Sequence, residues 1–279
     1  MNSLWLALAL TVGLLGLRCT RASPERPSVL PYDRPAYDAP FVAADVASHT
    51  DAGTLDAAVV DAAVGDGSAR DLVAADVAAE VRYMSLGDSF TIGTGSTPEQ
   101  AFPARLVARW RERCPVTLRN PAVNGYATQD LLDVELPMVQ GFAPTFVTLA
   151  VGANDIVRGR SLDEYRQQVR RIYAALAQAG VSASRVVALP QPDWSLSPAA
   201  RGFGEPDVIH AQIVSFNGAL REESTRAGAR YLDLFPLMER QARAGLIAPD
   251  GLHPSAEAHD AWAAELARSL DDVCRLSAR

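Results

Sequence analysis

The stretch Val81-Arg82-Tyr83-Met84-Ser85-Leu86-Gly87-Asp88-Ser89 decides how this chain of 279 residues is built. Its first six residues form a short, mostly apolar run of the kind found in buried strands, and Gly-Asp-Ser closes the run with a turn. Similar runs follow at residues 116–118, 146–151, 186–189 and 231–234. The sequence therefore predicts five strands, of which the quoted stretch is the first.

Segments with helical spacing separate these runs. They lie at residues 99–113, 128–136, 162–179, 207–227 and 255–273. Strand and helix thus alternate five times, which predicts an α/β fold with a parallel sheet and right-handed crossovers. In such folds ligands bind beyond the carboxyl ends of the strands, so the polar residues that follow each strand are the candidates for a site.

Polar residues occupy four such positions. Ser89 follows the first strand, Asn124-Gly125 the second, and Gly152-Ala153-Asn154-Asp155 the third, while Asp250-Gly251-Leu252-His253 precedes the last helix. Each of these segments alone is common in turns and loops. Their order along the chain and their shared edge of the predicted sheet make the combination specific.

The combination resembles the SGNH hydrolases, also called the GDSL esterase family, over residues 81 to about 273. Leu86-Gly87-Asp88-Ser89-Phe90 is similar to the nucleophile block, and Asn120-Pro121-Ala122-Val123-Asn124-Gly125 to the block with a single essential glycine, here Gly125. Gly152-Ala153-Asn154-Asp155 fits Gly-x-Asn-Asp, and Asp250-x-x-His253 fits the fourth block. The resemblance implies a flavodoxin-like three-layer α/β/α sandwich with a five-stranded parallel sheet and with Ser89 as the nucleophile.

The residue types also support serine chemistry directly. A serine hydroxyl needs a base during attack, and the neutral imidazole of His253 suits that role. The carboxylate of Asp250, three residues earlier, is able to orient the ring and stabilise the imidazolium. The backbone N–H groups of Ser89 and Gly125 and the side-chain amide of Asn154 are the candidates for an oxyanion hole, and glycine at 125 allows close backbone approach.

Several other kinds of site are disfavoured. The net charge is −7, so we expect no nucleic-acid partner. The residues around Ser89 do not form Gly-x-Ser-x-Gly, and the chain has no lysine for a phosphate loop. His253 and His259 have no cysteine pair nearby, so we expect neither a metal nor a cofactor. We expect His210 to be a satisfied or exposed helix residue.

Two acidic residues beside the candidate site need a separate explanation. Asp88 precedes Ser89, and Asp155 follows Asn154. An acid pair is one interpretation of them. Turn and hydrogen-bond network roles beside the two neighbours suit them better, so we expect those roles.

The residues before the domain point to export. An apolar run over residues 4–17 fits the core of an export signal at 1–19, and Cys19 resembles the lipidation cysteine of bacterial lipoproteins. Residues 20–80 are rich first in proline and then in alanine and aspartate, which is typical of a disordered linker. We expect a secreted, periplasmic or membrane-anchored protein, with plain secretion and a membrane tether through Cys19 both open.

The hydrolase domain is expected at residues 81–279, where Cys114 follows the first helix and Cys274 ends the last. In a doubly wound sheet with strand order 2-1-3-4-5, these two helices cover the same face. A disulfide in an exported protein is therefore one hypothesis, and two free thiols are the alternative.

The resemblance implies a serine esterase that hydrolyses carboxylic esters through an acyl-enzyme. The stretch at 191–204 contains proline, glycine and two aromatic residues, so we expect a loop that shapes the acyl or alcohol pocket. No long apolar lid segment is evident, which favours short acyl chains or polar alcohols over long-chain lipids. We therefore expect short-chain acyl esters of carbohydrates or small molecules as substrates, and we expect the protein to be a monomer. The alternatives are an O-acyltransferase, a lysophospholipase-like lipid esterase and a non-catalytic glycan-binding surface module.

Overall fold

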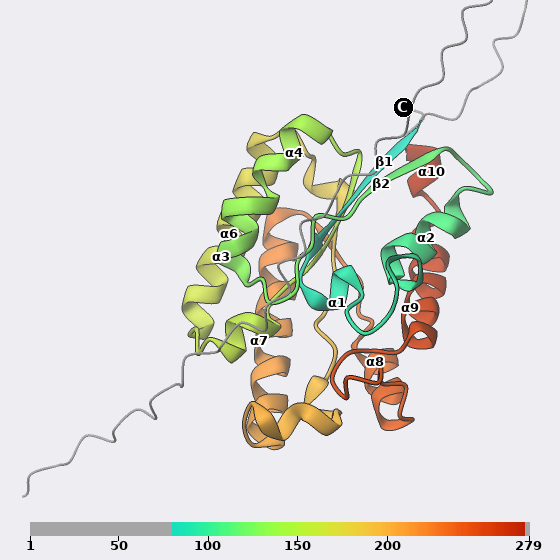
Figure 1. The fold of residues 1–279 in the computed structure, drawn as a ribbon. Helices are drawn as coiled ribbons and strands as arrows, with labels where there is room; N and C mark the ends of the chain where they lie inside the picture. Colours follow the sequence, from blue (N-terminus) through green and yellow to red (C-terminus); the bar gives the residue numbers. More distant parts are fainter. Residues whose placement is uncertain (1–79, 277–279) are drawn as a thin grey trace, which may run out of the picture. The chain divides into compact units, whose positions relative to one another are not determined.

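The computed structural model describes residues 80–276 (Figure 1). The expected export signal at 1–19, Cys19, the linker up to residue 79 and the last three residues lie outside this part of the chain. One parallel sheet has the strand order β2-β1-β3-β4-β5. Its strands are β1 (Val81–Gly87), β2 (Val116–Arg119), β3 (Phe146–Ala150), β4 (Val186–Ala188) and β5 (Arg230–Tyr231). The predicted α/β class and five-stranded parallel sheet are confirmed.

The central strands are buried on both faces because their side chains alternate between two hydrophobic clusters. Met84 and Leu86 of β1 belong to one cluster, and Val81 and Tyr83 of the same strand to the other. All of β3 is buried as well. The sheet therefore forms the middle of three layers.

Helices cover each face of the sheet (Figure 1). The first cluster collects side chains from the segment 128–142 and from the two longest helices, and the second from helices near both ends of the domain. On the first face lie α3 (Thr128–Asp130), the π-helical turn η2 (Leu131–Glu135), α4 (Pro137–Phe142), α6 (Leu162–Gln178) and α7 (Pro206–Ala227). On the second lie α2 (Phe102–Trp110), α8 (Phe235–Arg243), α9 (Ala256–Ser269) and α10 (Val273–Leu276).

A disulfide connects the first and last helices on the second face of the sheet. Cys114, just after α2, is bonded to Cys274 of α10, and their Cα atoms are 5.7 Å apart. The helices that open and close the domain are thus neighbours, as the strand order requires. Of the two hypotheses for these cysteines, the structure contains the disulfide.

The structure differs from the sequence prediction mainly at short elements. The last strand was expected at 231–234 but pairs only at Arg230–Tyr231, because the chain turns away after Leu232, whose N–H still bonds to the Ala188 carbonyl. Three helices were not predicted from the sequence: α8, α1 (Ser89–Ile92) and α5 (Ala153–Val157). Among the described residues, no helix combines the length and the apolar character needed to cross a membrane.

Candidate active site

The first functional segment is the sharp turn between β1 and α1. Gly87 pairs with Ala150 of β3, and a Cβ at Gly87 would lie 2.5 Å from the Ala150 carbonyl oxygen and 2.1 Å from Thr91 Oγ1. A side chain at this position would therefore collide with backbone. Glycine is required here so that the chain can turn directly from the strand into the short helix that carries Ser89.

Ser89 is held at the start of α1 and is almost fully buried, with 5% of its surface exposed. The preceding Asp88 caps the helix, because its Oδ1 accepts a hydrogen bond of 3.0 Å from the Phe90 N–H. Gly93 ends the helix in a left-handed conformation, with φ of 85°. Asp88 thus has the turn role expected from the sequence.

Asp250 and His253 form a hydrogen-bonded pair in the loop before α9. The Asp250 Oδ2 lies 2.7 Å from His253 Nδ1, and Oδ1 accepts from the backbone N–H groups of Leu252 and His253 at 2.9 and 3.0 Å. Partial burial raises the pKa of Asp250, but these hydrogen bonds outweigh it and the net pKa lies below its ordinary value. The carboxylate therefore stays ionised beside the ring.

The loop after α1 closes against this carboxylate. Gly95 has φ of +87°, and a Cβ added to it would lie 3.1 Å from Asp250 Oδ2 and 2.6 Å from the Ala248 side chain. Both the left-handed backbone and the close approach favour glycine here. The nucleophile segment and the acid thus meet directly.

The His253 ring lies against the residue that follows Ser89. Its centroid is 5.2 Å from that of the Phe90 ring, and the histidine is buried. Within residues 80–276, neither the Ser89 hydroxyl nor His253 Nε2 is hydrogen-bonded to another protein atom, so both are available to a substrate. Catalytic hydrogen bonds of this type often tighten only when substrate binds.

Gly125 and Asn154 lie on two further loops that are tied together. Asn154 Nδ2 donates to the Tyr126 carbonyl at 3.0 Å, which leaves the second N–H of the amide available. Gly125 has φ of +84°, and a Cβ there would meet no atom within 4 Å. In the protein alone, glycine is thus required by the left-handed backbone and not by close packing.

Asp155 links the loop that carries Asn154 to the segment that follows Gly125. Its buried carboxylate accepts from the Thr128 hydroxyl at 2.6 Å and from the Thr128 N–H at 3.0 Å, and it pairs with Arg160 at 2.6 Å. Burial raises the pKa of Asp155, while the Thr128 and Arg160 contacts oppose that rise. Asp155 therefore has the network role expected from the sequence.

The sequence and the fold have counterparts among known proteins. A family model described as GDSL-like Lipase/Acylhydrolase family matches residues 85–261. The chain belongs to this family. A search of the curated proteins returned no match.

Solved structures with the same fold include three with informative names. TesA is 19% identical with a TM-score of 0.56, over 69% of this chain and 99% of TesA. The psychrotrophic esterase EstA from Pseudoalteromonas sp. is 18% identical with a TM-score of 0.56, over 68% and 97% of the two chains. Axe2, an acetylxylan esterase from Geobacillus stearothermophilus, is 17% identical with a TM-score of 0.56, over 69% and 95%. At these identities the likeness shows the fold.

Beneath the GDSL turn lies a buried acid that sequence reasoning missed. The Gly87 N–H donates to Glu135 Oε2 at 3.0 Å, at the edge of β1 where β2 has already ended at Arg119. Burial raises the pKa of Glu135 to about 9, and burial likewise raises the pKa of the neighbouring Asp88 to about 8. The segment 128–136 also contains Asp130 and Asp133, so nothing in the sequence singled out Glu135 as the buried acid.

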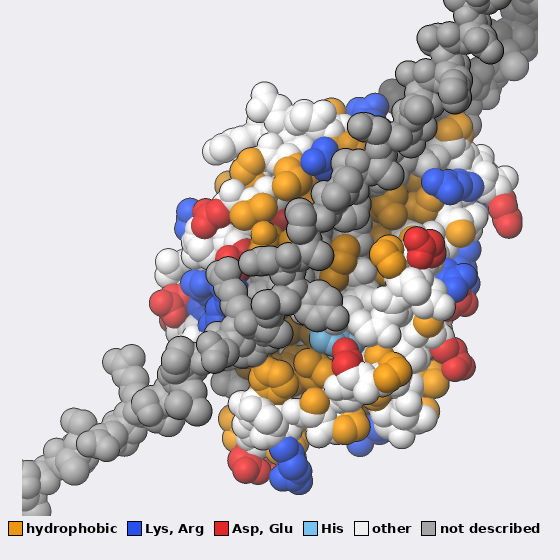
Figure 2. Space-filling model, in the orientation of Figure 1, with side chains coloured by type: hydrophobic (Ala, Val, Ile, Leu, Met, Phe, Trp, Pro, Cys, Tyr) orange, Lys and Arg blue, Asp and Glu red, His pale blue; other side chains and the backbone are white. Residues whose placement is uncertain are grey.

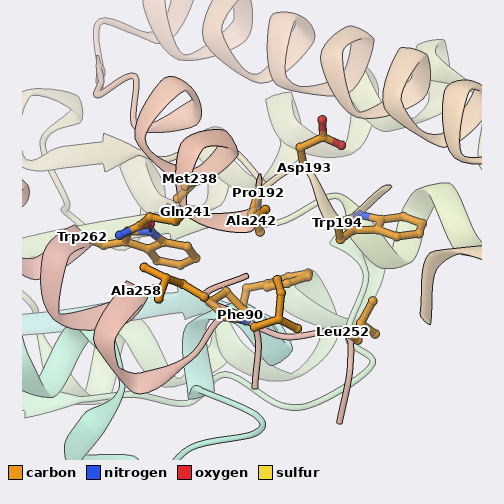
Figure 3. Close-up of a pocket in the computed structure, with 13 residues that line it drawn as sticks. Phe90, Pro192, Asp193, Trp194, Met238, Gln241, Ala242, Leu252, Ala258 and Trp262 are labelled. Atoms are coloured by element: carbon orange, nitrogen blue, oxygen red, sulfur yellow. Dashed lines mark hydrogen bonds between the residues drawn. The ribbon is translucent and has the colours of Figure 1, made fainter. Parts of the chain in front are cut away.

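A small cavity lies beside Phe90 and the His253 loop (Figure 3). It leaves about 20 Å³ for the centres of water-sized groups, which is enough for one or two of them. Its walls come from the stretch after β4, from α8 and α9, and from both neighbours of His253: Phe90, Pro192, Asp193, Trp194, Met238, Gln241, Ala242, Leu246, Ile247, Leu252, Pro254, Ala258 and Trp262. Pro192, Asp193 and Trp194 belong to the loop that was expected to shape a pocket.

Hydrophobic side chains lie close to a histidine on one face of the domain. Figure 2 shows orange side chains on both sides of a pale blue histidine patch and a red acidic side chain. Within residues 80–276, no group of three or more His, Cys, Asp or Glu side chains is arranged to hold a metal ion.

Proposed function

We propose that this GDSL-family chain is a serine esterase that cleaves carboxylic esters through an acyl-enzyme on Ser89. The supporting observation is the Asp250–His253 pair, with Nδ1 and Oδ2 2.7 Å apart, whose ring packs beside Phe90. The arrangement leaves Nε2 of the ring to take the Ser89 proton. The ionised Asp250 holds the ring orientation and stabilises the imidazolium that forms.

The reaction then follows two balanced steps. Ser89 Oγ attacks the ester carbonyl while its proton passes to His253 Nε2, and the tetrahedral intermediate expels the alcohol, which takes that proton. A water molecule gives its proton to the same nitrogen and attacks the acyl-enzyme, which releases the acid and restores the serine. His253 thus acts as base and acid in each half of the cycle.

Three donors are proposed to stabilise the negative oxygen of the intermediate. They are the backbone N–H groups of Ser89 and Gly125 and the free N–H of the Asn154 amide. The Asn154 hydrogen bond to Tyr126 and the Asp155 contacts to Thr128 support this role because they fix two of the donors before substrate arrives. Preorganised donors of this kind are each worth about 3 kcal/mol.

The cavity supports a short acyl group. Its space of about 20 Å³ admits only one or two groups of the size of water, which favours a small acyl group such as acetyl over a long chain. We therefore propose short-chain acyl esters of carbohydrates or small molecules as substrates. The solved structure named as an acetylxylan esterase has the same fold, which agrees with a sugar ester as the substrate class.

The Cys114–Cys274 disulfide supports export of the enzyme, because disulfides persist in oxidising compartments. Mass measurement of protein recovered from outside the cytoplasm, with and without reductant, tests this point. Two free thiols in that protein would contradict it.

The decisive experiment uses the full chain and 4-nitrophenyl esters from acetate to octanoate. We expect kcat/KM to be highest for acetate or propionate and to vanish in Ser89→Ala. A phosphonate that labels the wild type but not Ser89→Ala would trap the nucleophile. A preference for octanoate would instead favour a lipid esterase, and acyl transfer to an added sugar in preference to water would favour a transferase.

A further inference from the structure

A second carboxylate–histidine pair lies on the opposite side of the cavity from α9. His210 Nδ1 of α7 is 2.7 Å from Asp193 Oδ2, and the Ser195 hydroxyl donates to the other oxygen of the same carboxylate. The Asp193 carboxylate is completely buried, whereas 43% of the His210 side chain is exposed. The expectation of a satisfied or exposed helix residue at 210 is met, and its partner is a residue of the cavity wall.

Asp193 connects the cavity to α7. Its neighbours Pro192 and Trp194 line the cavity with it, and Figure 3 shows the Asp193 carboxylate directed away from Phe90 and Leu252. The carboxylate reaches His210 instead. The hydrogen bond therefore fastens the cavity wall to a long helix and leaves the carboxylate outside the space available to substrate.

Helix α7 also forms hydrogen bonds with Gln191, just before the residues that line the cavity. Asn217 Oδ1 accepts from the Gln191 N–H at 2.8 Å, and Asn217 Nδ2 donates to the Gln191 carbonyl at 2.9 Å. Asn217 and His210 are seven residues apart on α7, so they lie on the same side of the helix. The segment 191–193 is thus held at two points by one rigid element.

The segment 191–193 leads directly to Trp194, which also lines the cavity. The regular structure here is limited to the 3₁₀ turns η4 (Trp194–Leu196) and η5 (Pro198–Gly202). Side-chain contacts position the indole instead: its ring packs edge-on against Phe203 at 5.6 Å. The Ser197 hydroxyl also donates to the Trp194 carbonyl at 2.7 Å. A wall built from a loop depends on such contacts for its rigidity.

We propose that His210 is a positioning residue that, through Asp193, fixes Trp194 and so sets the upper limit of acyl length. This inference rests on the proposed esterase function. His210 is not a second base for a serine, because Asp193 lies between it and Ser195 and accepts from both. Its action on the substrate passes through the wall.

The test compares His210→Ala, which removes the hydrogen bond, with His210→Asn, whose amide N–H can replace Nδ1. Gln212→Ala is the matched control, because Gln212 is an exposed residue of the same helix. We measure kcat/KM of the full chain for esters from acetate to octanoate. The ratio of hexanoate to acetate should rise about tenfold in His210→Ala, in line with the worth of one or two methylenes in a pocket. His210→Asn and Gln212→Ala should keep the wild-type ratio.

A milder variant and a second readout keep the test decisive if His210→Ala folds poorly. Ser195→Ala removes the other hydrogen bond to Asp193 and should shift the ratio in the same direction by a smaller factor. Acrylamide quenching of tryptophan fluorescence should increase in His210→Ala and not in His210→Ala combined with Trp194→Phe. A hexanoate-to-acetate ratio that stays at the wild-type value in both His210→Ala and Ser195→Ala would overturn the positioning role, whatever the quenching shows.

Failure of the underlying function would look different. If wild type and Ser89→Ala cleave every ester equally, the esterase proposal fails, whereas the quenching result still reports on the wall. If wild type is active and the acyl-length profile does not respond to His210, only the positioning role fails.

Discussion

The two carboxylate–histidine pairs, Asp250–His253 and Asp193–His210, contain the same kind of hydrogen bond but differ in which partner is buried. In both, Nδ1 is 2.7 Å from a carboxylate oxygen. The side chain of His253 is 9% exposed and that of Asp250 34%, whereas His210 is 43% exposed and Asp193 is completely buried. In one pair the histidine is enclosed, and in the other the carboxylate is.

This inversion teaches what each pair is able to do. A base must exchange protons with a substrate in a water-poor site, so the His253 ring is enclosed beside Phe90. Its carboxylate partner accepts hydrogen bonds from two backbone N–H groups. An anchor must satisfy a buried carboxylate, so Asp193 takes two side-chain donors and the ring faces solvent. The same kind of hydrogen bond is therefore proposed to support catalysis in the Asp250–His253 pair and to hold the cavity wall in place in the Asp193–His210 pair.

The largest effect is expected when the same substitution is made in each histidine. His253→Asn should lower kcat/KM for the acetate ester about ten-thousand-fold, because no base remains for Ser89. His210→Asn should change it by less than about tenfold. Steady-state kinetics with thermal melts of both variants check this, and comparable losses in the two would mean that the pairs do not differ as described.

Substitution of the two carboxylates should also have distinct effects, one on catalysis and the other on stability. Asp250→Asn should lower kcat by about a thousandfold or more with little loss of stability, because the ring loses its orientation and its counter-charge. Asp193→Asn should cost about 1 to 3 kcal/mol of unfolding free energy, since its two donors lose a buried acceptor. Urea denaturation beside kinetics measures both. An Asp193 variant with full stability would show that the wall does not need its anchor.

The difference between the pairs also explains what the sequence was able to predict. Asp250 and His253 are three residues apart, and Ser89, Gly125 and Asn154 lie in short blocks after strands, so local patterns predict them. The parallel sheet and the family resemblance together predict that these segments meet at one edge, because the carboxyl ends of the strands share that edge.

The second pair could not be predicted in that way. Asp193 and His210 are seventeen residues apart, and their contact depends on the path of an irregular loop across a helix. Glu135 was missed for a related reason: its partner is a backbone N–H left open where β2 ends, which only the strand register reveals. Residues whose roles depend on where a neighbouring element stops leave little local signal.

Substitution of the proposed oxyanion-hole residue Asn154 should have a smaller effect on catalysis. Asn154→Ala should lower kcat about a hundredfold with a small change in KM, because the amide is proposed to contact the reacting oxygen mainly in the transition state. Gln140→Ala, at an exposed position of α4, serves as a control. A rise in KM with kcat preserved would place Asn154 in substrate binding and leave the negative charge to the backbone donors.

His259, in contrast to His210 and His253, has no carboxylate partner among the described residues. It is completely buried between Phe102 and Trp262, and neither ring nitrogen has a hydrogen-bond partner among the described residues. Burial lowers the pKa of His259 to about 4, and the nearby His253 adds to this. The folded protein therefore keeps the ring neutral where the unfolded chain, with a pKa of about 6.5, takes up a proton.

The unfolding free energy should therefore fall as pH drops from about 6.5 towards 4, by about 2 kcal/mol from this group at pH 4.5. Asp88 and Glu135, whose pKa burial raises, favour the folded state more at lower pH and oppose this trend. The informative quantity is thus the wild-type value minus that of His259→Phe, measured by urea denaturation at pH 7 and pH 4.5. A difference that does not change between the two pH values would mean that His259 finds a proton-accepting partner, and the contrast between paired and unpaired rings would be lost.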